Sequence, residues 1–170
     1  YHHLVYDFNA RNAQTLLDGA VADLAWEDYA NSVVSLGRAI VQSNELRDKF
    51  ADKDPIVKLM LNDEFGRGVV SNGVIKMRGY SGYDLNMAPI GEAWRGASPS
   101  KLPDAFVNEV KNRKGVDRVR IITRVWLDGD VPQLTVIVPV GGLHTVGYLG
   151  VHADPLHALQ PLDQRLGTHA

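Results

Sequence analysis

Three arginines and a tryptophan share one face of a predicted strand, and they are the most chemically promising group in this sequence. Residues 118–127 alternate in the manner of a β-strand, which places on one face Arg118, Arg120, Ile122, Arg124 and Trp126. The planar guanidinium of arginine pairs bidentately with a carboxylate or a phosphate. An indole supplies an apolar wall or a seat for a cation. The opposite face, which includes Val125 and Leu127, is expected to be core.

Further arginine and aromatic side chains fall on neighbouring predicted segments. The segment 83–95 is expected to close over the arginine face as a loop. Alternation also places Val146, Tyr148, Gly150 and His152 on one face of the last strand. The predicted ligand-binding residues are Arg78, Tyr80, Tyr83, Trp94, Arg124, Trp126 and Tyr148. The alternatives are a solvated strand edge for each arginine and core or lid packing without ligand contact for each ring.

Helices are predicted to precede these strands. Residues 3–44 carry apolar side chains at helical spacing, which predicts one long helix or two in tandem. Asp54 is the predicted N-cap of the next helix, with Pro55 at its first position. Gly66 is predicted to end that helix.

From Val69 onward the periodicity changes to that of strands. Residues 69–70 and 74–80 are predicted to pair across a turn at 71–73, and a second turn is predicted at 81–84. The other predicted elements are strands at 85–88, 118–127, 134–140 and 145–152, a loop at 91–101 and a short helix at 103–113. The strand 134–140 is apolar on both faces, which favours an interior position. Asp154 and Pro155 are predicted to start a last helix that ends at Gly167.

The composition is that of one globular domain. The chain has 170 residues, 45% of them hydrophobic, a net charge of -2 and no cysteine. These values exclude collagen, a disordered tail and a disulfide scaffold, and they argue against nucleic acid as a partner. Thiol catalysis and cysteine-based zinc sites are excluded. No apolar run within the sequence reaches the length of a membrane span.

Catalytic motifs are missing from the sequence. It contains no G-x-S-x-G elbow, phosphate loop, H-E-x-x-H pair or dinucleotide fingerprint. His152, Asp154 and His157 cluster near the predicted last helix, where capping or surface roles are favoured over metal binding. We therefore expect no enzyme, no metal site and no cofactor.

The order of elements resembles that of extracytoplasmic PAS-like (Cache/PDC-type) sensor domains of bacteria. The local resemblance lies in the stretch from Pro139 to His144, in Gly147 to His152, and in Asp154-Pro155-Leu156, which look like a last hairpin and exit helix. It implies an α+β fold, with a long N-terminal helix or helices packed on a five-stranded antiparallel sheet. One sensor domain, residues 1–170, would comprise a helical part (1–66), the PAS-like sheet (67–154) and a C-terminal exit helix (155–170).

The resemblance also implies a setting and a function. The segment is expected to be a piece of a longer receptor, held in the periplasm between two helices that span the inner membrane. A small molecule, such as a carboxylate or an amino acid, would bind above the sheet, and the domain would form a homodimer through its N-terminal helix. The expected function is ligand sensing for a chemoreceptor, histidine kinase or diguanylate cyclase. Alternatives are a dimerisation or protein-interaction module without a ligand, and an α+β enzyme without a known motif.

Overall fold

The computed structural model describes residues 10–70, 74–96 and 101–160. Three helices come first: α1 (Ala10–Ile40), α2 (Asn44–Ala51) and α3 (Ile56–Val70). The Ser43 hydroxyl caps α2 by accepting a hydrogen bond from the backbone N–H of Leu46. Before α3, the Asp54 carboxylate accepts one from the N–H of Ile56 at 2.9 Å. The predicted capping role of Asp54 is therefore confirmed.

One antiparallel sheet of five strands follows, in the order β2-β1-β5-β4-β3. Its strands are β1 (Met77–Tyr83), β2 (Pro89–Trp94), β3 (Ile122–Asp128), β4 (Val131–Val140) and β5 (Gly147–Ala153). Helix α4 (Asp104–Lys111) and the 3₁₀ segment η2 (Gly115–Val119) lie between β2 and β3. Two further 3₁₀ segments, η3 (Gly142–His144) and η4 (Pro155–Leu159), flank β5. The predicted α+β architecture is confirmed, and it is consistent with a PAS-like sheet.

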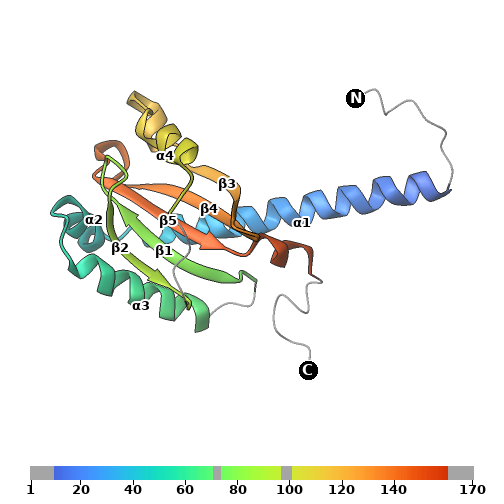
Figure 1. Ribbon diagram of the computed structural model, residues 1–170, viewed down its shortest axis with the longest axis horizontal. Coiled ribbons are helices and arrows are strands. Elements are labelled where there is room, and N and C mark those ends of the chain that lie inside the picture. Colours follow the sequence, from blue (N-terminus) through green and yellow to red (C-terminus); the bar gives the residue numbers. More distant parts are fainter. Residues whose placement is uncertain (1–9, 71–73, 97–100, 161–170) are drawn as a thin grey trace.

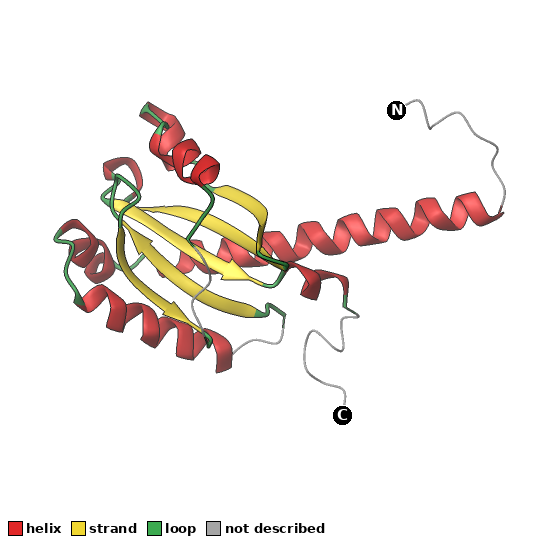
Figure 2. Ribbon diagram, viewed as in Figure 1, coloured by secondary structure: helices red, strands yellow, loops and turns green. Residues whose placement is uncertain are grey.

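The main core lies between the sheet and the first three helices (Figures 1 and 2). Helix α1 packs on β4 and β5, while α3 packs on β1 and β2. The part of α1 nearer the N-terminus projects beyond the sheet (Figure 1). Side chains that are buried completely on this face of the sheet include Tyr80, Leu134, Val136, Val140, Leu149, Val151 and Ala153.

A buried tyrosine joins α1 to one end of the sheet. The Tyr29 hydroxyl donates a hydrogen bond to the backbone oxygen of Asp154 at 2.6 Å and accepts one from the N–H of Lys76 at 3.2 Å. The Asp154 carboxylate pairs with Lys76 and Arg78 and caps η4 through the N–H of Leu156. The helix, β1 and the chain after β5 are therefore held together at this end.

A second, smaller core covers part of the outer face of the sheet, which is the face turned away from α1. Helix α4 packs there through Phe106 and Val110. Their partners are Tyr83, Met87, Leu102, Ile122, Ile137 and Tyr148. Because α4 covers only part of this face, the rest of it is free to line a pocket.

Several predicted boundaries are wrong. Helix α3 continues past Gly66 to Val70, so residues 69–70 are helical rather than a strand. The second strand lies at Pro89–Trp94, not at 85–88, and it replaces part of the predicted loop 91–101. After β5 the structure has the 3₁₀ segment η4, which Asp154 caps with Pro155 next to it. The predicted helix start before residue 10, the turn at 71–73 and the exit helix beyond residue 160 lie outside the described residues.

The prediction that one face of 118–127 is core is also wrong. Arg118 precedes β3 within η2, and Arg120 is the residue that follows η2. Within β3, Val125 and Leu127 are 52% and 67% exposed on the side of the sheet that carries α1. The reason is that β3 is the edge strand and α1 packs on β4 and β5 instead. The apolar segment 134–140, in contrast, lies in the interior strand β4, as predicted.

None of the helices in the described part of the chain is both long enough and apolar enough to cross a membrane.

Two leucines that differ in exposure, Leu149 and Leu127, provide a test of this packing. Leu149→Ala removes a completely buried side chain of the main core, and we expect the free energy of unfolding to fall by about 2–5 kcal/mol. Leu127→Ala, on the uncovered edge strand, is the matched control and should change it by less than about 0.5 kcal/mol. Equilibrium urea denaturation measures both, and equal losses would contradict the described packing.

Candidate functional site

A pocket of about 350 Å³ opens on the outer face of the sheet, beside α4. Its floor comes from β1, β2, β3 and β5, and its rim comes from the turn after β1 and the chain around the start of α4. The pocket is lined by Ser81, Tyr83, Met87, Pro89, Glu92, Trp94, Lys101, Leu102, Asp104, Val107, Trp126 and His152. Its size is within the range of small-molecule sites.

His152 is the centre of the pocket floor. Its side chain is only 1% exposed, and both of its ring nitrogens are hydrogen-bonded. Nε2 lies 2.8 Å from the Ser81 hydroxyl on β1, and Nδ1 lies 2.8 Å from the Thr135 hydroxyl on β4. The Thr135 oxygen also accepts a hydrogen bond from the indole N–H of Trp126 on β3 at 2.8 Å. One polar network therefore crosses four strands beneath the pocket.

Trp94 on β2 brings the fifth strand into this arrangement. Its ring stacks on the His152 imidazole with centroids 4.6 Å apart and planes tilted by 31°. Its indole N–H donates to Glu92 Oε2 at 2.6 Å. The ring fits because Gly79 lies next to it on β1, where a Cβ would collide with the indole and with the Ala93 carbonyl oxygen. Glycine at 79 is therefore required for this stack.

Burial keeps two ionisable groups of the floor, His152 and Tyr83, neutral. It lowers the pKa of His152 from its usual 6.5 to about 3, because the imidazolium would lose its hydration. Burial also raises the pKa of the Tyr83 phenol to about 12; the hydrogen bond with Ser81 opposes this rise, and the charge of Glu92 adds to it. Near neutral pH both side chains are therefore uncharged.

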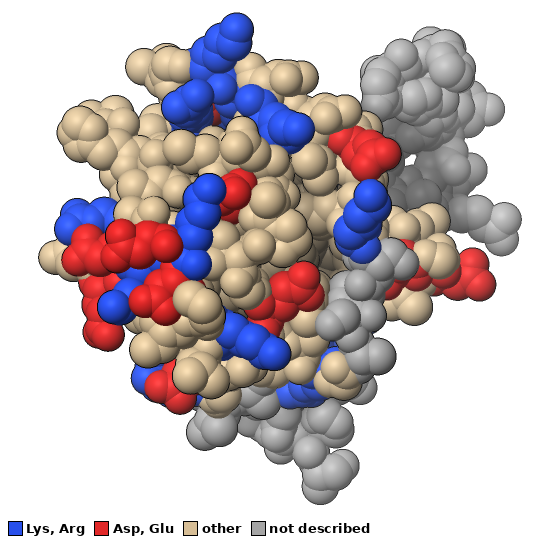
Figure 3. All heavy atoms as spheres, turned by 60° about the vertical axis from the view of Figure 1, so that its left-hand side comes forward, with Lys and Arg blue, Asp and Glu red and all other residues tan. Residues whose placement is uncertain are grey.

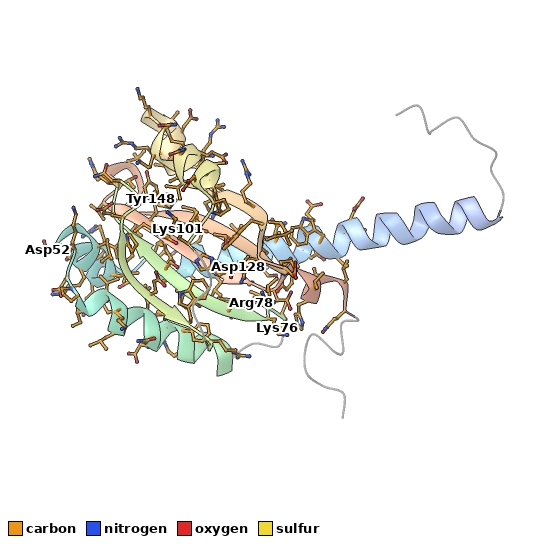
Figure 4. The ribbon with its side chains drawn as sticks, viewed as in Figure 1. Asp52, Lys76, Arg78, Lys101, Asp128 and Tyr148 are labelled. Carbon is orange, nitrogen blue, oxygen red and sulfur yellow. The ribbon has the colours of Figure 1, made fainter. Side chains whose placement is uncertain are left out.

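The charged side chains lie around this neutral floor. Glu92 is half-buried, while Lys101 and Asp104 are exposed at the rim. Lys101 extends over the sheet between Tyr148 and Arg78, which lie toward opposite ends (Figure 4). Figure 3 shows blue basic side chains gathered at the top of the molecule and a largely tan surface with scattered charged side chains below them. The pocket therefore combines aromatic walls with few charges.

Three of the seven residues predicted from the sequence line this pocket. Tyr83, Trp94 and Trp126 come from β1, β2 and β3, and the fold brings their rings around a single cavity. Tyr148 lies on the same face of the sheet, but it packs in the small core under α4 and does not line the cavity. The segment 83–95 contributes to the pocket as a turn and a strand rather than as a loop.

Neither of the predicted arginines faces the pocket. Arg78 pairs with Asp154 at 3.3 Å and donates a hydrogen bond to the Pro132 carbonyl oxygen at 2.9 Å. Arg124 pairs with Glu109 on α4 and is half exposed. Both guanidinium groups are therefore engaged by protein carboxylates outside the cavity, because α4 and the end of β5 carry acidic side chains next to them.

The position predicted for Tyr80 is wrong. An irregularity in the pairing of β1 with β5, between Met77 and Gly79, shifts the alternation of β1 by one residue. Tyr80 consequently lies in the main core together with Met77, and Gly79, Ser81 and Tyr83 occupy the pocket face. The predicted turn at 81–84 is also displaced, because β1 continues to Tyr83.

Sequence reasoning missed Ser81, Glu92 and, above all, His152 as pocket residues. A signal for His152 was present, since alternation placed it on the same face as Tyr148. The expected capping or surface role of this histidine is wrong, because its ring is buried under Trp94. No comparable signal marked Ser81, which was assigned to a turn.

The described residues contain no group of three or more histidine, aspartate or glutamate side chains arranged to hold a metal ion. No family model matches the chain, and no curated protein matches it either. The chemistry of the pocket is therefore the basis on which its function is inferred.

Acidification provides a test of the buried imidazole. Below about pH 6.5 the unfolded chain binds a proton at His152 that the folded chain binds only near pH 3. Stability is therefore lost as the pH falls, by about 2–3 kcal/mol at about pH 4.5. Urea denaturation over this interval should show a smaller loss for His152→Gln than for the unaltered protein. His144→Gln, at an exposed position, is the control and should keep the full loss. Equal losses in His152→Gln and the unaltered protein would contradict a neutral buried imidazole.

Proposed function

We propose that this domain is a ligand-sensing input module that binds a small molecule in the pocket on the outer face of its sheet. The observation that carries this proposal is the pocket itself, with three aromatic rings around a neutral hydrogen-bonded floor. Concave sites with apolar walls and a few convergent polar groups are typical of small-molecule binding. A catalytic role has less support, because burial lowers the pKa of His152 to about 3, which makes its imidazole a weak general base.

The way in which the sheet separates the pocket from α1 supports a signalling role. Gly37 of α1 lies so close to β4 and β5 that a Cβ there would stand 2.8 Å from Val138 and 3.3 Å from Val151. Val151 immediately precedes His152, whose side chain reaches the opposite face. A ligand that favours one arrangement of the pocket floor therefore acts on strands that α1 contacts directly. This is a population shift between two packings, limited by the ligand's differential affinity for them.

The proposal includes the setting implied by the resemblance to periplasmic sensor domains. In that setting the domain is the extracytoplasmic part of an inner-membrane receptor, and α1 carries the signal toward the membrane. The PAS-like order of the sheet and the projection of α1 beyond it support this setting.

The alternative is a dimerisation module that binds no ligand. The observation in its favour is the apolar edge on the α1 side of the sheet, where Val125 and Leu127 of β3 are exposed. Under this alternative the described domain would self-associate at micromolar concentration and would respond to no small molecule. Analytical ultracentrifugation combined with the ligand screen below distinguishes the two.

Blocking the pocket tests the proposal. A thermal-shift screen across amino acids, organic acids and organic amines should find a compound that stabilises the domain. At about 100 times its dissociation constant, such a ligand adds about 2.7 kcal/mol, or about 5–10 °C in Tm. Val107→Trp, at a half-buried position of α4 that lines the cavity, should abolish the shift because the indole occupies the ligand's volume.

Val125→Trp is the matched control, because it makes the same substitution at an exposed position on β3, and it should keep the shift. Arg124→Ala should also keep it, since Arg124 lies outside the cavity. A shift that survives Val107→Trp, or the lack of any shift across the screen, would contradict binding in this pocket.

A further inference from the structure

We propose that the pocket selects small organic cations that carry an ammonium group, an inference that rests on the ligand-sensing function proposed above. The residues expected from the sequence favoured an anion, because they included two arginines. The geometry of the pocket points to the opposite charge, for three independent reasons.

The first reason is that the polar groups of the two pocket tryptophans are already used. Trp94 donates its indole N–H to Glu92, and Trp126 donates its indole N–H to Thr135. Neither ring can therefore give a hydrogen bond to an anionic ligand without losing one inside the protein. What the rings present to the cavity is aromatic surface, whose negative face attracts a cation.

The second reason is the lack of positive charge in the floor. Among the described residues, His152 is the only histidine that lines the cavity, and it is held between two hydroxyl groups beneath Trp94. An imidazolium at this position would favour an anion, but burial keeps the ring neutral. Arg78 and Arg124 are paired with Asp154 and Glu109 outside the cavity.

The third reason is the placement of the carboxylates. Among the described residues that line the cavity, the charged ones are Glu92, Lys101 and Asp104. Lys101 and Asp104 are both exposed at the rim, where solvent screens them and their opposite charges offset each other. Glu92 is the charged group that lies deeper, next to Trp94. A cation held against the rings would therefore lie near the Glu92 carboxylate rather than near the Lys101 ammonium group.

Two series of probes that share a shape and differ in charge test this selectivity. One series is choline, its neutral isostere dimethylbutanol and the anion dimethylbutanoate. The other is phenethylamine, phenethyl alcohol and phenylpropanoate. Isothermal titration calorimetry on the domain, with each probe at up to about 10 mM, should show that the cation of at least one series binds. We expect that cation to bind about fivefold or more tightly than its neutral isostere, and tighter still than its anion.

Charge-neutralising variants assign the preference to the pocket. Glu92→Gln keeps an oxygen that accepts the Trp94 N–H, so the fold should be preserved, and it should weaken binding of the cation by about fivefold or more. Asp104→Asn, at an exposed position on α4, provides a second variant whose folding is not at risk. It should weaken the binding of the cation less than Glu92→Gln does. Glu45→Gln, an exposed carboxylate on α2 away from the cavity, is the matched control and should bind the cation as the unaltered protein does.

The possible outcomes separate this inference from the sensing function on which it rests. Equal binding within a series, tighter binding of an anion, or no binding of either cation would overturn the selectivity for cations. If an anion binds and Val107→Trp abolishes that binding, the pocket remains the sensing site and only the ligand class is wrong. If a cation binds equally well to Val107→Trp, the pocket itself is contradicted.

Discussion

The burial of one imidazole is the constraint on which the rest of the site depends. His152 lies on β5, the middle strand, and almost no solvent reaches it, so each ring nitrogen must have a partner within the protein. Ser81 and Thr135 supply those partners from the strands on either side. Trp126 then reaches Thr135 from the edge, and Trp94 covers the ring from the other edge. The His152 side chain thus determines the positions of both pocket tryptophans, Trp94 and Trp126.

The same sheet serves two purposes because its faces differ in chemistry. On the face toward α1, β4 and β5 contribute buried aliphatic side chains to the main core. On the outer face, the hydroxyl groups, the imidazole and the glycines leave room for a cavity that α4 covers only in part. In the proposed function, a change in the outer face would reach α1 across the thickness of one sheet. This arrangement suits a sensor whose binding site and output helix are distinct.

The order of helices and strands could be predicted from the sequence because long periodic segments and capping residues such as Asp54 are local signals. The site could be predicted only in part. Aromatic residues were recognised as pocket walls, and Tyr83, Trp94 and Trp126 do line the cavity. Arginines were expected to face the ligand, but their direction depends on carboxylates from α4 and from the end of β5, which alternation cannot locate. The shift in β1 that buries Tyr80 depends on pairing with β5, and it likewise leaves no local mark.

The most direct test of the central claim is heteronuclear NMR of the histidine ring nitrogens. Between about pH 8 and about pH 5, an ordinary histidine titrates with a midpoint near 6.5. We expect the His152 ring, assigned by comparison with the His152→Gln spectrum, to keep one protonated and one unprotonated nitrogen throughout this interval. A His152 ring that titrates near pH 6.5 would show that the imidazole is solvated, and the pocket floor described here would be incorrect.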